Sequence, residues 1–262
     1  MIEARNLSAA HGRTEVLRGV DLRFEDGRMV GLLGPNGAGK TSLLLALSGL
    51  LRPSRGEALL DGRPVRETAP RARAQTVAVV PQQAETGSGL RCLSVVLMGR
   101  RPHLSFWGGY TRADLDLAVA AMRETGVEEL AERRLDQVSG GEFKRVLIAR
   151  ALAQDTPALL LDEAAAGLDA AAKMAVCEMM AAKAAKGSLV LAVMHDLNLA
   201  ALFCHRLVFL KRGRVVLDGP TADVFTRQTL SEIYETPVCV APHPVTGAPQ
   251  ALFVPASATD AV

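Results

Sequence analysis

The chain has 262 residues, 49% of them hydrophobic, which is enough for a large buried core and excludes a disordered protein. Lysine and arginine number 30 against 28 acidic residues, so the net charge of +2 predicts no binding of nucleic acid. No apolar run approaches the ~18 residues of a membrane span, and we expect no signal peptide. The scattered cysteines (Cys92, Cys177, Cys204 and Cys239) indicate unpaired thiols in a reducing cytoplasm.

Residues 1–33 are predicted to be mainly β-structure. Segment 15–25 alternates apolar and polar residues, as a half-buried strand does. Segment 28–34 is an almost continuous apolar run, which is typical of a buried central strand. The strongly apolar stretch 40–50 predicts a buried helix. Further strands are expected over 56–62 and 76–83.

Residues 92–134 change to a helical composition, and we interpret them as a helical subdomain inserted into a sheet domain. Thr111 is a favourable cap and Gly126 a favourable end for one of its helices. Beyond it we expect helix 142–153, strand 158–163, helix 170–186, strand 188–195 and a hairpin over 206–219.

The predicted fold class is α/β, with a mainly parallel core sheet, an N-terminal antiparallel β part and the helical insertion. The core domain comprises 1–91 and 135–236. The tail 237–262 is rich in proline and alanine, and the sequence predicts no element there.

The sequence GPNGAGKT at 34–41 matches the phosphate-binding pattern G-x-x-x-x-G-K-[ST], between an apolar strand and a helix. Its glycines let backbone N–H groups point into one concavity that binds phosphate oxygens. Lys40 adds a positive charge for the β- and γ-phosphates, and the Thr41 hydroxyl is a ligand for Mg²⁺. A simple glycine turn is the alternative, which the strand–loop–helix context disfavours. The predicted nucleotide contacts are Gly34, Pro35, Asn36, Gly37, Ala38, Gly39, Lys40, Thr41 and Ser42.

Asp162 and Glu163 end the apolar strand ALLLDE, where parallel sheets bind their ligands. We predict that Asp162 holds Mg²⁺ and that Glu163 orients or deprotonates the attacking water; an acid that caps a helix is the alternative. His195 ends the next strand and is placed to reach the γ-phosphate and the water, although a lone histidine is more often a packing residue. Gln82 carries a neutral amide that can reach the metal.

A second anion-binding pattern lies at VSGGE, residues 138–142. Ser139 offers a hydroxyl, Gly140 and Gly141 allow close approach of the backbone, and a helix begins behind them. A plain helix cap at Ser139 is the alternative. The chain therefore holds two candidate phosphate sites that lie far apart in the sequence.

These motifs, in this order, resemble the ATP-binding subunit of an ABC transporter. In that family they are the Walker A loop at 34–41, the Q-loop at Gln82, the signature at 138–142, Walker B at 158–163, the D-loop at 167–169 and the switch histidine at His195. The resemblance implies an ATPase that uses ATP and Mg²⁺ in a head-to-tail homodimer. Ser139, Gly140, Gly141 and Glu142 of one subunit would then cover the γ-phosphate of ATP bound by the other.

Three positions depart from the family pattern. His11 stands where the family has an aromatic residue, usually tyrosine, that stacks on adenine, and imidazole stacks over a smaller area. Glu142 stands where glutamine is usual. Alanines follow Glu163 in place of the usual Pro-Thr, which affects the expected stiffness of that loop.

Segments 194–203, 219–226 and 243–255 resemble the ATPases of iron-siderophore, haem and vitamin B12 importers. The resemblance implies uptake of a metal chelate, with ferric siderophore first and haem or cobalamin next. It implies a homodimer beneath two integral-membrane permease subunits, with a substrate-binding protein as an indirect partner, at the cytoplasmic face of the inner membrane. The alternative is a soluble ABC ATPase that acts on ribosomes, DNA or iron–sulfur assembly.

Overall fold

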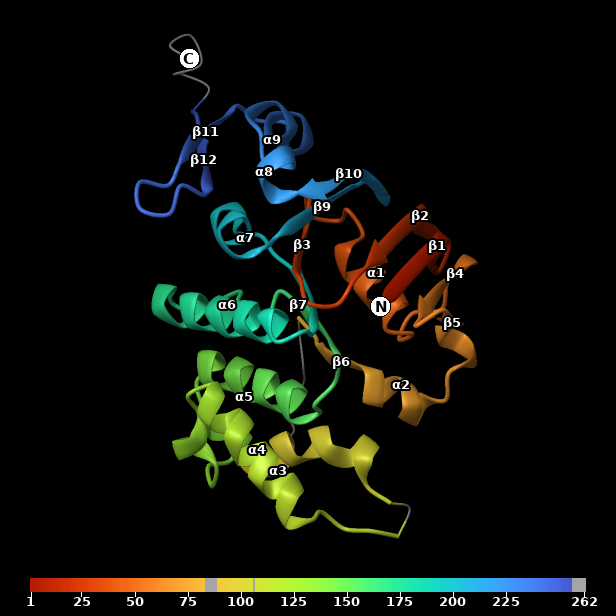
Figure 1. The fold of residues 1–262 in the computed structure, drawn as a ribbon, viewed down its shortest axis with the longest axis vertical. Helices are drawn as coiled ribbons and strands as arrows, with labels where there is room; N and C mark the ends of the chain where they lie inside the picture. The colour runs from red at the N-terminus through yellow and green to blue at the C-terminus, as the bar shows by residue number, and fades with distance from the viewer. Residues whose placement is uncertain (83–88, 106, 256–262) are drawn as a thin grey trace.

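A six-stranded sheet runs through the centre of the molecule (Figure 1). A computed structural model describes residues 1–82, 89–105 and 107–255. The strand order is β10-β9-β3-β8-β7-β6, and every neighbouring pair is parallel except β10 with β9. The strands are β3 (Met29–Leu33), β6 (Val77–Val80), β7 (Ala158–Asp162), β8 (Leu189–Val193), β9 (Arg206–Lys211) and β10 (Arg214–Pro220). β3, β7 and β8 are buried along their whole lengths, as their apolar runs predict.

A second, antiparallel sheet contains the N-terminal strands. Its order is β2-β1-β4-β5, with β1 (Ile2–His11), β2 (Thr14–Phe24), β4 (Arg55–Leu60) and β5 (Arg63–Pro64). Helix α1 (Lys40–Leu47) packs against both sheets. Its Leu43 and Leu44 are fully buried in one core with Leu17 of β2 and Leu32 of β3. The N-terminus of α1 is therefore fixed where the two sheets meet.

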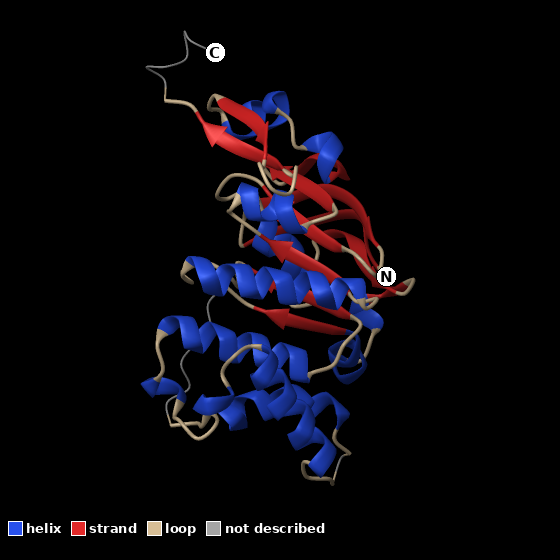
Figure 2. Ribbon diagram, turned by 60° about the vertical axis from the view of Figure 1, so that its left-hand side comes forward, coloured by secondary structure: helices blue, strands red, loops and turns tan. Residues whose placement is uncertain are grey.

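Helices α5 (Gly140–Ala153), α6 (Ala170–Ala185) and α7 (Leu197–Phe203) share a second core with the central sheet. Figure 2 shows helices covering one face of the strands and gathering at one end of the molecule. Within the part of the chain that the structure describes, no helix has the length and apolarity needed to cross a membrane.

The end that consists of helices alone contains α3 (Cys92–Leu97), the 3₁₀ turn η2 (Met98–His103), α4 (Arg112–Glu124) and η3 (Glu128–Leu130) (Figure 1). Thr111 caps α4, and its capping box with Asp114 agrees with the predicted helix start. A buried ion pair joins Arg100 Nε to Asp114 Oδ1 at 2.9 Å, and Arg100 Nη1 also donates to the carbonyl oxygen of Ala153 at 3.0 Å. One buried guanidinium thus joins η2, α4 and the end of α5.

The tail for which no element was predicted forms a hairpin. β11 (Val238–Pro242) pairs with β12 (Pro249–Phe253), and the hairpin packs on α7 and on α9 (Arg227–Tyr234). Its strands are only five residues long and each carries a terminal proline, so the apolar periodicity is too short to stand out. The remaining elements are η1 (Val65–Glu67), α2 (Pro70–Thr76), η4 (Leu135–Gln137) and α8 (Thr221–Val224).

Two predicted strands are shorter than expected. The strand expected over 76–83 ends at Val80, because the next residue, Pro81, has no N–H group to continue the ladder. The strand expected over 188–195 ends at Val193. The polar side chains that follow both strands are therefore carried by the connecting segments rather than by the strands themselves.

Candidate nucleotide-binding and catalytic site

A glycine-rich loop leads from β3 into α1. Gly34 has a φ of 138°, and a Cβ atom there would lie 1.9 Å from the carbonyl oxygen of Leu210. Gly39 has a φ of 102°, and its Cβ would lie 2.6 Å from the carbonyl oxygen of Val16. Both positions require glycine, because any side chain would be strained and would collide with neighbouring backbone.

The loop borders a hollow of about 310 Å³. Residues 36–42 line it together with Val16, Gln82 and Glu163. Backbone N–H groups at the start of a helix, beside an open space of this size, are suited to bind phosphate groups. The sequence did not point to Val16, because an apolar residue on an alternating strand carries no sign of ligand contact.

Lys40 is buried, with 6% of its surface exposed. Its Nζ donates hydrogen bonds to the carbonyl oxygens of Gly34 at 2.8 Å and Pro35 at 3.0 Å. Burial lowers the pKa of Lys40, while the carboxylates of Glu163 and Asp162 oppose that shift. The ammonium group is thus held within the loop, where incoming phosphate oxygens would be a stronger partner than two neutral carbonyls.

Thr41 and Asp162 bring two oxygen ligands together. Thr41 Oγ1 donates a hydrogen bond of 3.1 Å to Asp162 Oδ1. Burial raises the pKa of Asp162, and the hydrogen bond from Thr41 opposes this shift. A hydroxyl and a desolvated carboxylate are the hard oxygen donors that Mg²⁺ prefers, so the pair fits this ion.

Glu163 follows β7, and both of its carboxylate oxygens are engaged. Gln82 Nε2 donates to Glu163 Oε2 at 2.7 Å, and His195 Nε2 is hydrogen-bonded to Glu163 Oε1. These residues come from the ends of three adjacent strands, β6, β7 and β8. The structure therefore brings together Gln82, Asp162, Glu163 and His195 beside the loop that carries Lys40.

Two further contacts hold the glycine-rich loop, and they come from the turn between β9 and β10 and from α9. The backbone N–H of Gly213, in the turn between β9 and β10, donates to the Ala38 carbonyl at 3.0 Å. Tyr234 of α9 is hydrogen-bonded to the backbone of Gly34, and burial raises the pKa of its phenol to about 12. The sequence indicated only a hairpin over 206–219 and gave no sign that Tyr234 reaches this loop.

His11 ends β1, and its imidazole points toward α1. His11 Nε2 lies 3.1 Å from Ser42 Oγ, with the donor set by the tautomer of the ring. This contact places the imidazole next to the loop that is expected to bind phosphate. The expected contact with adenine stays a prediction.

The signature residues lie at the start of α5, which begins at Gly140 rather than at 142. Ser139 and Glu142 form a capping box: Glu142 N–H donates to Ser139 Oγ at 3.3 Å, and Ser139 N–H donates to Glu142 Oε2 at 2.7 Å. The backbone N–H of Ser139 lowers the pKa of the Glu142 carboxyl. Ser139, Gly140 and Gly141 are absent from the described lining of the hollow beside Lys40.

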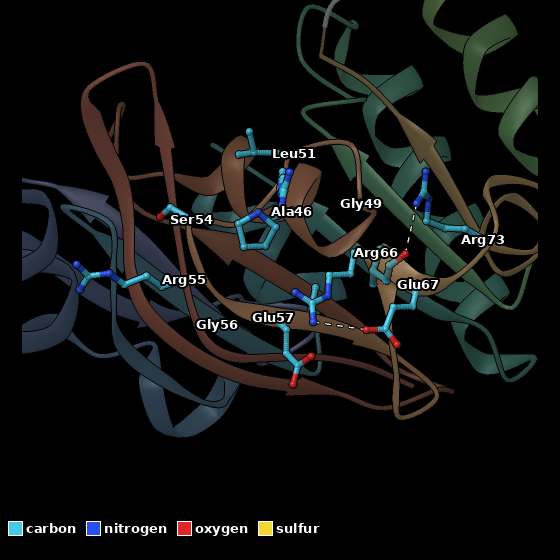
Figure 3. Close-up of a pocket in the computed structure, with 14 residues that line it drawn as sticks. Ala46, Gly49, Leu51, Ser54, Arg55, Gly56, Glu57, Arg66, Glu67 and Arg73 are labelled. Atoms are coloured by element: carbon cyan, nitrogen blue, oxygen red, sulfur yellow. Dashed lines mark hydrogen bonds and ion pairs between the residues drawn. The ribbon is translucent and has the colours of Figure 1, made fainter.

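A second, larger hollow of about 800 Å³ lies beside the C-terminal end of α1 (Figure 3). Four arginines and two glutamates line it: Arg52, Arg55, Arg66, Arg73, Glu57 and Glu67. We refer to it as the arginine-lined hollow. Arg66 pairs with Glu67, as Figure 3 shows. Arg73 donates to the carbonyl oxygen of Val65 at 3.4 Å. None of its lining residues is among the polar side chains gathered beside Lys40.

Comparison with known sequences identifies the family. The sequence profile of the ABC transporter family matches residues 17–166. The hemin import ATP-binding protein HmuV of Myxococcus xanthus (strain DK1622) is 43% identical over 261 residues, covering 97% of this chain and 96% of that protein. The HmuV protein of Nocardia farcinica (strain IFM 10152) is 46% identical, and the match covers 89% of this chain and 80% of that protein. The cobalamin import ATP-binding protein BtuD of Halobacterium salinarum (strain ATCC 29341 / DSM 671 / R1) is 39% identical, and the match covers 94% of this chain and 62% of that protein.

Solved structures share the fold. An inward-facing structure described as that of a metal-chelate type ABC transporter superposes with a TM-score of 0.83, at 23% identity over 98% of both chains. A dimeric ATP-binding cassette bound to ADP and Pi has a TM-score of 0.76, at 26% identity over 84% of this chain and 99% of that one. These structures confirm the predicted fold, a P-loop NTPase with a mainly parallel core sheet and an antiparallel N-terminal part.

The fold and the polar residues around its glycine-rich loop define an ATP-hydrolysing enzyme. The chain belongs to the ABC transporter family, as an ATP-binding subunit. The hemin and cobalamin import proteins among its relatives confirm the predicted resemblance to the ATPases of metal-chelate importers.

Proposed function

We propose that this chain is the ATPase of an importer and that it powers the uptake of haem. The observation that carries the proposal is the 43% identity to a hemin import protein across nearly all of both chains. The cobalamin import protein is less similar, and this chain covers only 62% of it. The relatives compared above name no siderophore, so haem replaces ferric siderophore as the first substrate to test.

For hydrolysis, we propose that Glu163 orients or deprotonates the attacking water. The hydrogen bonds from Gln82 and His195 support this role, because they fix both oxygens of the carboxylate beside the loop. Lys40 would exchange its carbonyl partners for the β- and γ-phosphates of ATP. His195 would then contact the γ-phosphate and the water.

Thr41 and Asp162 are the groups that would hold Mg²⁺, with the Gln82 amide oxygen as a third candidate. Among the described residues, no group of three or more acidic, cysteine or histidine side chains is placed to hold a metal ion. Thr41 and Asp162 would leave the remaining positions of the ion to phosphate oxygens and water, the usual arrangement for Mg²⁺. When bound, Mg²⁺ would offset negative charge on the β- and γ-phosphates.

We propose that Ser139, Gly140, Gly141 and Glu142 act on ATP bound by a second copy of the chain. Their position outside the hollow beside Lys40 supports this arrangement. The first N–H groups of α5 have no partner within the helix and favour an anion. A Cβ at Gly140 would meet no atom within 4 Å, so a ligand can approach from outside.

The other proposed partners are two integral-membrane permease subunits and, through them, a substrate-binding protein. The chain would then lie at the cytoplasmic face of the inner membrane. The arginine-lined hollow supports a permease contact, because its four arginines suit an acidic loop. Leu50, which lies in the sequence between the lining residues Gly49 and Leu51, is 64% exposed. We further propose that 92–134 form a helical subdomain, distinct from the core of 1–91 and 135–236.

Reconstitution tests this function. The chain is assembled with its permease subunits in liposomes, and ATP-dependent uptake of haem, cobalamin and a ferric siderophore is measured side by side. We expect haem uptake that requires ATP and is lost in the Glu163→Gln variant, which keeps the shape of the site. Preferential uptake of the siderophore or of cobalamin would contradict haem as the cargo.

A further inference from the structure

The C-terminal hairpin is hydrogen-bonded to the first turn of α7. The Asn198 side chain makes two contacts with one residue of β12: Oδ1 accepts from the Ala251 N–H at 2.7 Å, and Nδ2 donates to the Ala251 carbonyl at 3.4 Å. Ala251 is buried, so water competes little for these groups. The amide therefore attaches α7 to the hairpin, and Figure 1 shows β12 beside α7.

The same turn of α7 fixes the backbone next to His195. Asp196 caps the helix, since its Oδ1 accepts hydrogen bonds from the N–H groups of Asn198 and Leu199, each at 3.0 Å. His195 immediately precedes this cap, and its imidazole is hydrogen-bonded to Glu163. Any shift of the start of α7 therefore moves the imidazole relative to that carboxylate.

The hairpin is in turn anchored close to the glycine-rich loop. The N–H of Val238 in β11 donates to Ser231 Oγ of α9 at 3.1 Å. Lys211, at the end of β9, bonds to the last turn of α9 and to the residue after it. β9 pairs with β3, whose end carries the loop. A continuous set of contacts thus runs from the loop through α9 and the hairpin to α7.

We propose that Asn198 is a positioning residue for ATP hydrolysis: by fixing α7 to the C-terminal hairpin, it holds His195 in place against Glu163. Asn198 acts through His195 and not on ATP itself. The inference rests on the proposed roles of Glu163 and His195. A displacement of about 1 Å at a catalytic group costs up to ~100-fold in rate, so a single hydrogen-bonded contact is enough to matter.

The test compares Asn198→Ala with Asn198→Asp in the full chain. Alanine removes both hydrogen bonds, and we expect kcat for ATP hydrolysis to fall about 10-fold while the Kd for ATP changes less than about twofold. Aspartate keeps the shorter bond, as acceptor for the Ala251 N–H, but loses the donor to the Ala251 carbonyl, so kcat should fall less than in Asn198→Ala. Leu252→Ala, on the exposed side of β12, is the matched control and should leave kcat unchanged.

Variants of His195 separate this inference from the proposed function. If His195→Ala hydrolyses ATP at the normal rate, the proposed role of the histidine fails, and the inference fails with it. If His195→Ala is inactive but Asn198→Ala is normal, only the positioning role is wrong. In the double variant, Asn198→Ala should add no loss to that of His195→Ala. If the losses in kcat from the two substitutions instead multiply in the double variant, Asn198 acts on general stability and not through His195, which would overturn the proposal.

Discussion

Glu163 holds a backbone conformation that side chains rarely adopt. Its φ is 51°, and its N–H donates to the Val193 carbonyl at 3.2 Å, which ties the end of β7 to the end of β8. Such a conformation costs about 1–3 kcal/mol, and it persists because surrounding contacts hold it. Here the contacts are those from Gln82 and His195. The strained residue is the one that we propose orients or deprotonates the attacking water.

His11 departs from the family pattern, and its substitution tests the adenine contact. If the ring lies against adenine, His11→Tyr should tighten ATP binding by about 0.5–1.5 kcal/mol, because tyrosine stacks over a larger area. The measurement is the Kd for ATP with Mg²⁺ by calorimetry. His11→Leu is the control, since it removes the hydrogen bond to Ser42 as tyrosine does but carries no aromatic ring, and it should not tighten binding. An unchanged Kd in His11→Tyr would mean that adenine is held elsewhere.

At the scale of elements, the Arg100–Asp114 pair joins three helical segments of the helical end. We expect Arg100→Met to lower the free energy of unfolding at pH 7 by about 3–5 kcal/mol, because it leaves Asp114 buried without its cation. The hydrogen bonds from Thr111 and Arg100 lower the pKa of Asp114 to about 2. The stabilisation by the ionised carboxylate is thus present above the unfolded pKa of about 4 and is lost as pH falls toward 2.

Denaturant unfolding at pH 7 and at pH 3 measures this effect. The difference between wild type and Arg100→Met should be smaller at pH 3, because this pH lies below the unfolded pKa of about 4 and part of the stabilisation by the ionised carboxylate is already lost. Arg112→Met is the control, because Arg112 pairs with Asp116 on the exposed surface of α4. A loss for Arg100→Met that is equal at both pH values would show that packing, and not the ion pair, dominates.

The elements differ in how far the sequence could predict them. β3, the glycine-rich loop and α1 were predictable, because an apolar run, fixed glycine spacing and an apolar helix are local signals. Asp162, Glu163 and His195 were predictable as candidates because Asp162 ends a buried strand and the other two closely follow buried strands. Asn198 and the hairpin of β11 and β12 were not, since their role depends on a contact between segments far apart in the sequence. Local periodicity carries no information about such a contact.

At the scale of the whole molecule, the trans arrangement of the signature can be tested in mixed dimers. One chain carries Lys40→Ala and the other Ser139→Ala. Head-to-tail docking places both lesions in one composite site, so the second site keeps Lys40 and Ser139 intact. We expect this dimer to occlude roughly one ATP, because the intact site retains its charged and helix-terminal donors. Retention of radiolabelled ATP after rapid gel filtration measures occlusion.

The control dimer places both substitutions on one chain and pairs it with wild type. Each composite site then carries one of the two substitutions, so neither site is intact and little ATP should be occluded. If Ser139 served the nucleotide of its own chain, the pattern would invert, because the wild-type chain would keep a whole site. Equal occlusion by the two dimers would contradict the trans arrangement.

The position of β3 has a consequence for biosynthesis. β3 is flanked by β8 and β9, with Val30 in register with Leu191 on one side and Arg206 on the other. A nascent chain that has already exposed GPNGAGKT therefore lacks both neighbours of the strand that carries it. Pairings across such long sequence separations form late in folding. We therefore expect ATP to bind only after the ribosome has released the chain through β9, and to stabilise the finished domain rather than guide its early folding.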